Sequence, residues 1–209
     1  MEDQKFSVSD LQEKVEQAVI EFMKEDPSLL GLKSAHEQAI SHRVAYYLEK
    51  KFPKSEKLNV DCEYNKRLGH PKRFSYDPVE YKKREYKGCP CKGCEKLRKG
   101  ETPCEKEFRP DIVVHLRRKN RRNLIVIEVK KNNKNKRCLF DEIKLRALTK
   151  PKNDGGKYRY KLGVFLYFPD GKPTLLPFLK GNKCHGCERV LQLDSVGNHV
   201  WTTASNNPR

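Results

Sequence analysis

The chain has 209 residues, with 45 Lys or Arg against 28 Asp or Glu, so its formal net charge is +17. Only 36% of its residues are hydrophobic, and no stretch approaches the roughly 20 consecutive apolar residues of a membrane-spanning helix. An integral membrane protein is therefore excluded, and the N-terminal residues lack the apolar segment of a secretory signal. We expect a basic cytoplasmic protein, and nucleic acid is the commonest polyanionic partner of that class.

Periodic apolar residues predict an α/β fold. The first helix is expected over residues 9–24, with Ser9 and Gln12 as a capping box. A second helix is expected over residues 34–51. The later expected elements are, in chain order, strands over 58–64, 111–116 and 124–129, a helix over 140–149, and strands over 158–168 and 174–179.

This order of elements indicates one α/β core with additions at both ends. The core is expected over residues 34–180, after an N-terminal helical extension over 1–33. A basic, cysteine-rich insert over 66–107 interrupts the core, and a cysteine-containing tail over 181–209 follows it.

Two carboxylates and a lysine stand at the facing ends of adjacent strands. Asp111 opens one expected strand, whereas Glu128 and Lys130 close the next. Because the two strands form an apparent hairpin, Asp111 and Glu128 are expected at the same edge of the sheet, with Glu128 and Lys130 on one face. Paired carboxylates suit Mg²⁺ or Mn²⁺, and a nearby lysine can orient water and offset charge on a phosphate. The pattern predicts metal-assisted phosphodiester hydrolysis.

Three more carboxylates are candidates for this site. Glu37 lies on the apolar stripe of the second helix, where a carboxylate is costly unless it is paired. Asp61 and Glu63 share one face of the first strand. The Glu-x-Lys spacing alone is weak, because it occurs four more times in the chain. Surface salt bridges at strand ends therefore stay open as the alternative to catalysis.

The ordered set of Glu37 on a helix, Pro110-Asp111 on a strand and Glu128-x-Lys130 on the next strand resembles the PD-(D/E)XK nuclease superfamily. The resemblance implies a restriction-endonuclease-like core, with a mixed central sheet flanked by helices, and Mg²⁺-dependent cleavage of DNA. By position, Asp111 and Glu128 would bind the metal and Lys130 would be the catalytic lysine. Glu37 would be the helix glutamate that many members use.

Residues 60–65, together with Asp141 and Lys144 on the later helix, are similar to bacterial and phage members of that superfamily. The expected function is a metal-dependent endodeoxyribonuclease of the restriction or defence type, and a Holliday-junction resolvase is the second choice. A homodimer is expected, since cutting both strands with one site per chain usually needs two copies. The alternative from a different class is a non-catalytic, zinc-stabilised nucleic-acid-binding module.

Six of the eight cysteines form two clusters with the spacing of zinc ligands. The candidate ligands are Cys89, Cys91, Cys94 and Cys104 in the insert and Cys184 and Cys187 in the tail. Either the insert closes its own structural Zn²⁺ site, or its Cys-x-x-Cys pair joins the pair in the tail. Free thiols in loops are the alternative to a zinc site.

Basic residues near the insert and in the turn after the second strand are expected to bind DNA phosphates. They are Lys82, Lys83, Arg84, Arg117, Arg118, Arg121 and Arg122. A solvated surface is the alternative for the basic residues of the insert. Tyr158 and Tyr160 are expected in the core or on the sheet surface more than as a platform for stacked bases.

Overall fold

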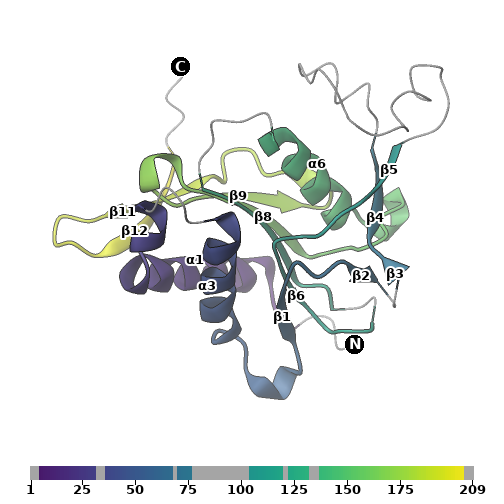
Figure 1. The fold of residues 1–209 in the computed structure, drawn as a ribbon, viewed down its shortest axis with the longest axis horizontal. Coiled ribbons are helices and arrows are strands. Elements are labelled where there is room, and N and C mark those ends of the chain that lie inside the picture. The colour runs from purple at the N-terminus through teal and green to yellow at the C-terminus, as the bar shows by residue number, and fades with distance from the viewer. Residues whose placement is uncertain are drawn as a thin grey trace.

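The computed structural model describes residues 5–31, 36–67, 70–76, 104–119, 122–131 and 137–204. The protein is a mixed α/β structure with an open, mostly antiparallel sheet flanked by helices (Figure 1). Its helices are α1 (Val8–Glu25), α2 (Ser28–Gly31), α3 (Glu37–Glu49) and α6 (Arg137–Thr149). Three short 3₁₀ turns are η1 (Lys54–Glu56), η2 (Lys152–Asp154) and η3 (Pro169–Gly171).

The main sheet has the strand order β1-β6-β7-β8-β9-β11-β12, and β10 pairs with β9. Strands β7 and β8 are parallel, joined through α6, and the other pairs in this sheet are antiparallel. The strand bounds are β1 Asn59–Cys62, β6 Ile112–His115, β7 Ile125–Lys130, β8 Leu162–Tyr167, β9 Thr174–Leu179, β10 Asn182–Lys183, β11 Arg189–Leu193 and β12 His199–Thr203.

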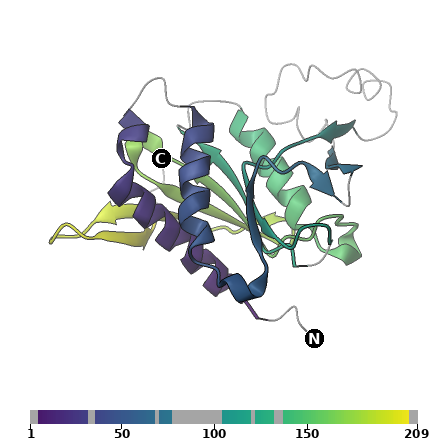
Figure 2. The same ribbon diagram turned by 60° about the horizontal axis from the view of Figure 1, so that its bottom comes forward.

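Helices cover both faces of the sheet, as Figure 2 shows. The apolar residues at odd positions of β7, such as Ile125 and Ile127, pack in one core with α1 and α3. Val126 faces the other way and packs with Leu145 and Leu148 of α6. Because side chains alternate along a strand, Glu128 and Lys130 follow Val126 toward the α6 face. The predicted continuous apolar run is thus buried on both faces.

Helix α1 begins earlier than the sequence pattern predicted. Ser7 is its N-cap, and Ser7 and Asp10 form the capping box through bonds of 3.0 and 2.8 Å between each side chain and the other's backbone N–H. The predicted box of Ser9 and Gln12 was wrong, since Ser9 lies inside the helix and Gln12 donates to Glu16. Ser and Asp at these positions satisfy backbone N–H groups that have no partner within the helix.

The insert contributes two small antiparallel ribbons at its ends. They are formed by β2 (Lys66–Arg67) with β3 (His70–Pro71), and by β4 (Arg73–Tyr76) with β5 (Cys104–Glu107). Residues 77–103 lie outside the described part of the chain. The predictions for Lys82, Lys83, Arg84, Cys89, Cys91 and Cys94 therefore stay predictions.

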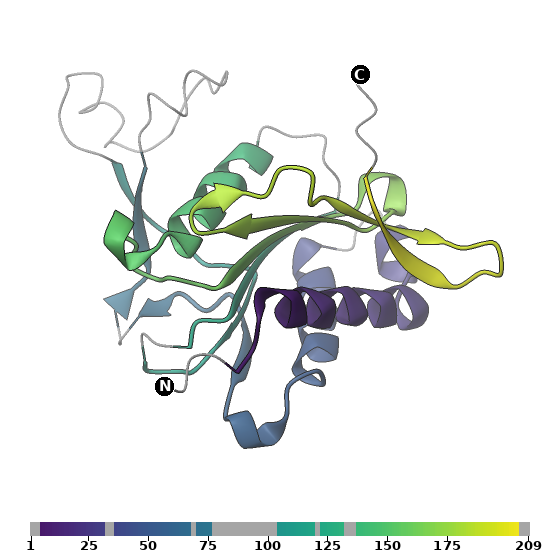
Figure 3. The ribbon, with the colours of Figure 1, turned by 180° about the vertical axis from the view of Figure 1, so that it is seen from behind.

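Residues 182–203 extend the main sheet beyond the predicted core. Strands β11 and β12 form a hairpin that projects from one end of the sheet (Figure 3). Leu191 is buried in the same core as α1, and the Trp201 indole donates to the Glu16 carbonyl at 3.2 Å. The C-terminal strands are thereby attached to the N-terminal helix. No helix in the described residues is long and apolar enough to cross a membrane.

The strand predicted over residues 158–168 begins later, at Leu162. Tyr158 and Tyr160 precede it and are buried in the core beneath α6. Between them, Arg159 is exposed and has a left-handed φ of 58°, so the backbone reverses there and is not extended. The expectation that these tyrosines belong to the core is confirmed.

Candidate active site

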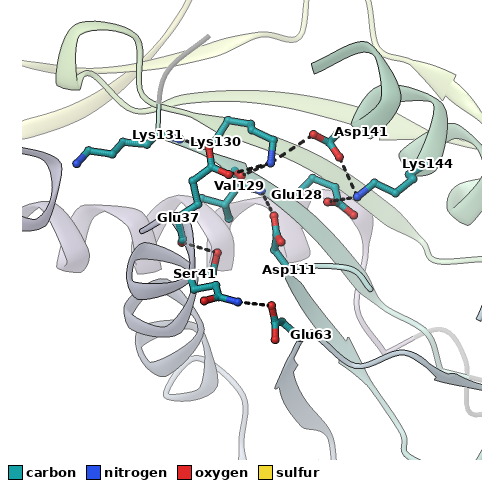
Figure 4. A network of polar contacts seen from close by, with 11 residues as sticks. Glu37, Ser41, Glu63, Asp111, Glu128, Val129, Lys130, Lys131, Asp141 and Lys144 are labelled. Carbon is teal, nitrogen blue, oxygen red and sulfur yellow. Dashed lines mark hydrogen bonds and ion pairs between the residues drawn. The ribbon is translucent and has the colours of Figure 1, made fainter. Parts of the chain in front are cut away.

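The carboxylates that the sequence singled out lie together where β6 begins and β7 ends. Ile112 pairs with Ile127 in an antiparallel register. Extending that register by one residue places Asp111 opposite Glu128. Both side chains point to the α6 face (Figure 4). Glu37 from α3 and Asp141 from α6 approach the same place, so one cluster joins elements from both sides of the sheet.

Glu128 is the most buried member of the cluster, with 1% of its side chain exposed. Its Oε2 accepts a 2.6 Å hydrogen bond from the Lys144 ammonium, whereas its Oε1 is buried and has no hydrogen-bond partner. Burial, together with the neighbouring Asp111 and Asp141, raises the pKa of Glu128 well above its usual value despite Lys144. A buried carboxylate oxygen without a partner is costly, and it marks a place for a further cation or proton.

Asp111 presents the second carboxylate. Its Oδ2 accepts a 2.7 Å hydrogen bond from the backbone N–H of Val129, which fixes the side chain against the end of β7. Burial raises the pKa of Asp111, and the Val129 N–H and nearby lysines only partly oppose the rise. The metal-free cluster therefore disfavours the ionised forms of both predicted metal ligands.

Lys130 lies between two other carboxylates. Its ammonium is 3.1 Å from Glu37 Oε2 and 3.4 Å from Asp141 Oδ2, and it also donates to the Val129 carbonyl. Burial alone would lower the pKa of Lys130, but Asp141, Asp111 and Glu37 outweigh it and raise the pKa. Lys130 thus stays charged at neutral pH, which suits an electrostatic role and not that of a general base.

Helix α6 supplies two residues that the sequence indicated only by their similarity to members of the nuclease superfamily, without a role in the site. Asp141 and Lys144 are three residues apart, so they face the sheet from the same side of the helix and pair at 2.8 Å. Lys144 also forms an ion pair with Glu128, and Asp141 also forms one with Lys130 (Figure 4). Their signal in the sequence was the helical spacing of opposite charges after a buried strand. That spacing alone is shared by many surface helices.

The charges of the cluster leave room for a divalent cation. Glu37, Glu128 and Asp141 form ion pairs with Lys130 or Lys144, whereas Asp111 accepts from a backbone N–H. Four carboxylates and two ammonium groups leave the cluster with two uncompensated negative charges when all six groups are ionised. No three His, Cys, Asp or Glu side chains in the described ranges are arranged to hold one ion. Magnesium commonly takes only one or two protein carboxylates and completes its shell with water and phosphate. The paired Asp111 and Glu128 fit that donor set.

Glu37 reaches the cluster from the first turn of α3. Its side chain is 43% exposed, so it is less buried than its place on the apolar stripe predicted. Its Oε2 accepts from Lys130, and its Oε1 accepts from the backbone N–H of Lys131 at 3.3 Å. The expectation that Glu37 needs a partner is met by Lys130.

The other two candidate carboxylates, Asp61 and Glu63, differ in their position relative to the cluster. The Asp61 side chain bonds to His115 at 2.9 Å and to Arg117 and does not join the cluster. Glu63 accepts from Gln38 at 2.7 Å, and its backbone N–H donates to the Asp111 carbonyl at 3.1 Å, so it lies beside the cluster (Figure 4).

Two of the predicted phosphate-binding arginines are engaged within the protein. Arg117 pairs with Asp61, and Arg122 pairs with Glu56 at 2.5 Å. Arg118 is exposed in the turn between β6 and β7, with a left-handed φ of 60°. Arg121 lies outside the described residues. Arg117 and Arg122 therefore attach the turn to β1 and to η1, whereas Arg118 exposes its charge on the surface.

Three of the cysteines predicted to bind zinc lie in the described part of the chain, and they leave that prediction untested. Cys184 and Cys187 are joined by a disulfide across a turn, so this pair must be reduced before it can bind a metal. Cys104 lies in β5, and its side chain is outside the described part of the structure. Zinc stays a prediction.

Sequence reasoning missed Lys72, a buried lysine between the insert ribbons. It is 3% exposed, and its ammonium donates to the Tyr64 carbonyl at 2.9 Å and to the Tyr160 hydroxyl at 3.1 Å. No described carboxylate pairs with it within 4 Å. Burial lowers the pKa of Lys72 to about 8.

Lys72 predicts a pH dependence of stability. Because its pKa is about 8 in the folded protein and near 10.5 unfolded, the unfolded state binds more protons between these values, and stability rises with pH across that window. The gain from this group is on the order of 3 kcal/mol. Urea unfolding of the wild type and Lys72→Met from pH 7 to 10.5 measures it. The wild type should gain stability relative to the variant, and parallel curves would contradict the assignment.

Comparisons with known proteins leave the site to be judged on its own chemistry. No family model matches the chain, and neither a curated protein nor a solved structure matches it.

Proposed function

We propose that the protein is a metal-dependent endodeoxyribonuclease whose active site is the cluster of Asp111, Glu128 and Lys130. The observation that carries the proposal is the buried, unpartnered Oε1 of Glu128 opposite Asp111, with a charged lysine at the same edge of the sheet. Burying two carboxylates side by side lowers the stability of the fold, which a purely structural role does not explain. Carboxylates are the usual protein ligands of a divalent ion that also contacts a phosphate.

Each residue has a role in hydrolysis. Asp111 and Glu128 would hold Mg²⁺ or Mn²⁺, which when bound acidifies a coordinated water and offsets phosphate charge. Lys130 keeps its proton between Glu37 and Asp141, so it can donate a hydrogen bond to the phosphate or to the attacking water. The water oxygen bonds to phosphorus and loses a proton to solvent, the bond between phosphorus and the leaving oxygen breaks, and the leaving oxygen takes up a proton from solvent.

The finer parts of the proposal follow the resemblance of Glu37, Asp111, Glu128 and Lys130 to the PD-(D/E)XK pattern. They are a restriction-endonuclease-like core, a restriction or defence role before junction resolution, DNA as the partner, and a homodimer that cuts both strands. A structural Zn²⁺ in the insert is part of the same proposal. The parallel β7–β8 pair within an otherwise antiparallel sheet, with its crossover helix α6 beside the site, agrees with a mixed core.

A cleavage assay tests the proposal. Wild-type protein at low salt should nick or linearise supercoiled plasmid with Mg²⁺ or Mn²⁺ and not with EDTA. Lys130→Ala should lose about 10²-fold in rate, the usual effect of removing one positioned charge from a transition state. Lys131→Ala is the matched control, because it removes the neighbouring lysine side chain and keeps the backbone N–H that bonds to Glu37.

Equal cleavage by wild type and Lys130→Ala would assign the activity to a contaminant or to another site. If neither plasmid nor branched DNA is cut while DNA binding persists, the non-catalytic binding module replaces the enzyme.

A further inference from the structure

A second candidate site is a cavity of about 500 Å³ at the other end of β8 from the acidic cluster. Lys130 of the cluster pairs with Tyr167 at the end of β8, whereas Tyr160 and Lys161 of the cavity precede the start of that strand. The cavity volume is in the range of small-ligand sites. Its walls come from Phe6, Ser7, Val8, Thr149, Pro151, Lys152, Arg159, Tyr160, Lys161, Leu179 and Lys180.

The lining combines apolar walls with positive charge. Four of its residues are Lys or Arg, and no acidic residue is among the described residues that line it. Lys152 and Lys180 are exposed and form no ion pair with another described residue. Positive charge without internal compensation, next to apolar surface, is complementary to an anion that also has an apolar part.

The backbone of this cavity is held in a strained but fixed form. Arg159 and Lys180 both adopt left-handed φ values, of 58° and 50°, a conformation that residues with a Cβ rarely adopt. Hydrogen bonds flank both positions, from Tyr160 N–H to the Leu148 carbonyl at 3.0 Å and from Gly181 N–H to Thr149 Oγ1 at 3.2 Å. These bonds fix the backbone on both sides of the cavity.

We propose that this cavity binds a small organic anion of the nucleoside phosphate class. The exposed cations Lys152 and Lys180 at one opening suit the two or more charges of a phosphate better than the single charge of a carboxylate. The apolar wall that includes Phe6, Val8 and Leu179 suits a base and sugar. The proposal does not depend on the nuclease, because the cavity shares no residue with the acidic cluster.

Calorimetric titration of the full chain in EDTA, which keeps metal away from the acidic cluster, tests the site. Thymidine 5′-monophosphate and adenosine 5′-triphosphate are the probes, and inorganic phosphate is the comparison. At least one nucleotide should bind roughly tenfold or more tightly than inorganic phosphate. Lys152→Glu/Lys180→Glu should lose this binding, and so should Val8→Trp, which fills the cavity without changing its charge.

The matched control is Lys24→Glu/Lys172→Glu, which makes the same change of net charge at two exposed lysines away from the cavity and should bind as the wild type does. Thermal melting of each variant verifies that it folds. Equal loss of binding in both double variants would show a general charge effect and overturn the proposal. Equal affinity for nucleotide and inorganic phosphate, or no binding of either nucleotide, would overturn it too.

Discussion

Asp111→Asn is expected to abolish metal-dependent cleavage and at the same time to raise the melting temperature of the metal-free protein. The loss of rate should be about 10³-fold or more, because an amide is a poor ligand in place of a carboxylate and several kcal/mol of transition-state stabilisation depend on the ion. The gain in stability follows from burial, which raises the pKa of Asp111 and so makes its ionised form costly. The Asn side-chain oxygen can still accept from the Val129 N–H.

The matched control for this prediction is Asp61→Asn, for which the expected change in melting temperature has the opposite sign. Burial opposes ionisation of Asp61, but Arg117 and His115 outweigh it and hold its pKa well below the usual value. Its charge therefore stabilises the folded state at neutral pH, and the variant should melt at a lower temperature while cleavage survives. Differential scanning calorimetry in EDTA and the plasmid assay in Mg²⁺ give the two readouts. Active Asp111→Asn, or a lower melting temperature for it, would argue against the metal site.

Lys144→Met is expected to cause the largest loss of stability of any single substitution considered. Lys144 is the only described cation within hydrogen-bond distance of the buried Glu128, at 2.6 Å, and it also pairs with Asp141. Removing one member of a buried ion pair costs about 3–5 kcal/mol, because Glu128 must then either keep a charge without compensation or take up a proton. Urea unfolding at pH 7 in EDTA measures the loss.

Two companion variants separate this cause from a general packing defect. Adding Glu128→Gln to Lys144→Met should restore more than half of the lost stability, because the uncompensated carboxylate is then neutral. Lys183→Met removes the more exposed pair with Glu142, whose atoms are 3.7 Å apart, and should cost less than about 1 kcal/mol. A small loss for Lys144→Met, or no recovery in the double variant, would mean that Glu128 is already neutral in the folded protein.

Local pattern was sufficient to predict the elements that position the site. The continuous apolar run ending at Glu128 is typical of a strand buried on both faces, and the pleat of such a strand puts Glu128 and Lys130 on one face. The hairpin of β6 and β7 brings Asp111 to the same edge without any long-range information. These contacts lie between segments that are adjacent in the chain, so periodicity and turn placement determine them.

Element ends and distant partners were beyond that reasoning. Helix α1 starts at the cap where Ser7 and Asp10 bond, although Ser9 and Gln12 had similar chemistry. The C-terminal strands join the sheet because Leu191 and Trp201 find apolar surface on α1, more than 160 residues away in sequence. Such choices depend on the free energy of packing between elements, which no local spacing encodes.

The sequence by itself determined which residue types meet at the end of β7, because strand alternation and a hairpin between adjacent segments place Asp111, Glu128 and Lys130 at one edge of the sheet. Only the tertiary structure decided how their charges are balanced. It brought α6 across the sheet, so that Lys144 reaches Glu128 and Asp141 reaches Lys130, and it left Glu128 Oε1 buried without a partner. Burial and the distances between charges set the electrostatics of a site, and both arise only when separate elements pack together.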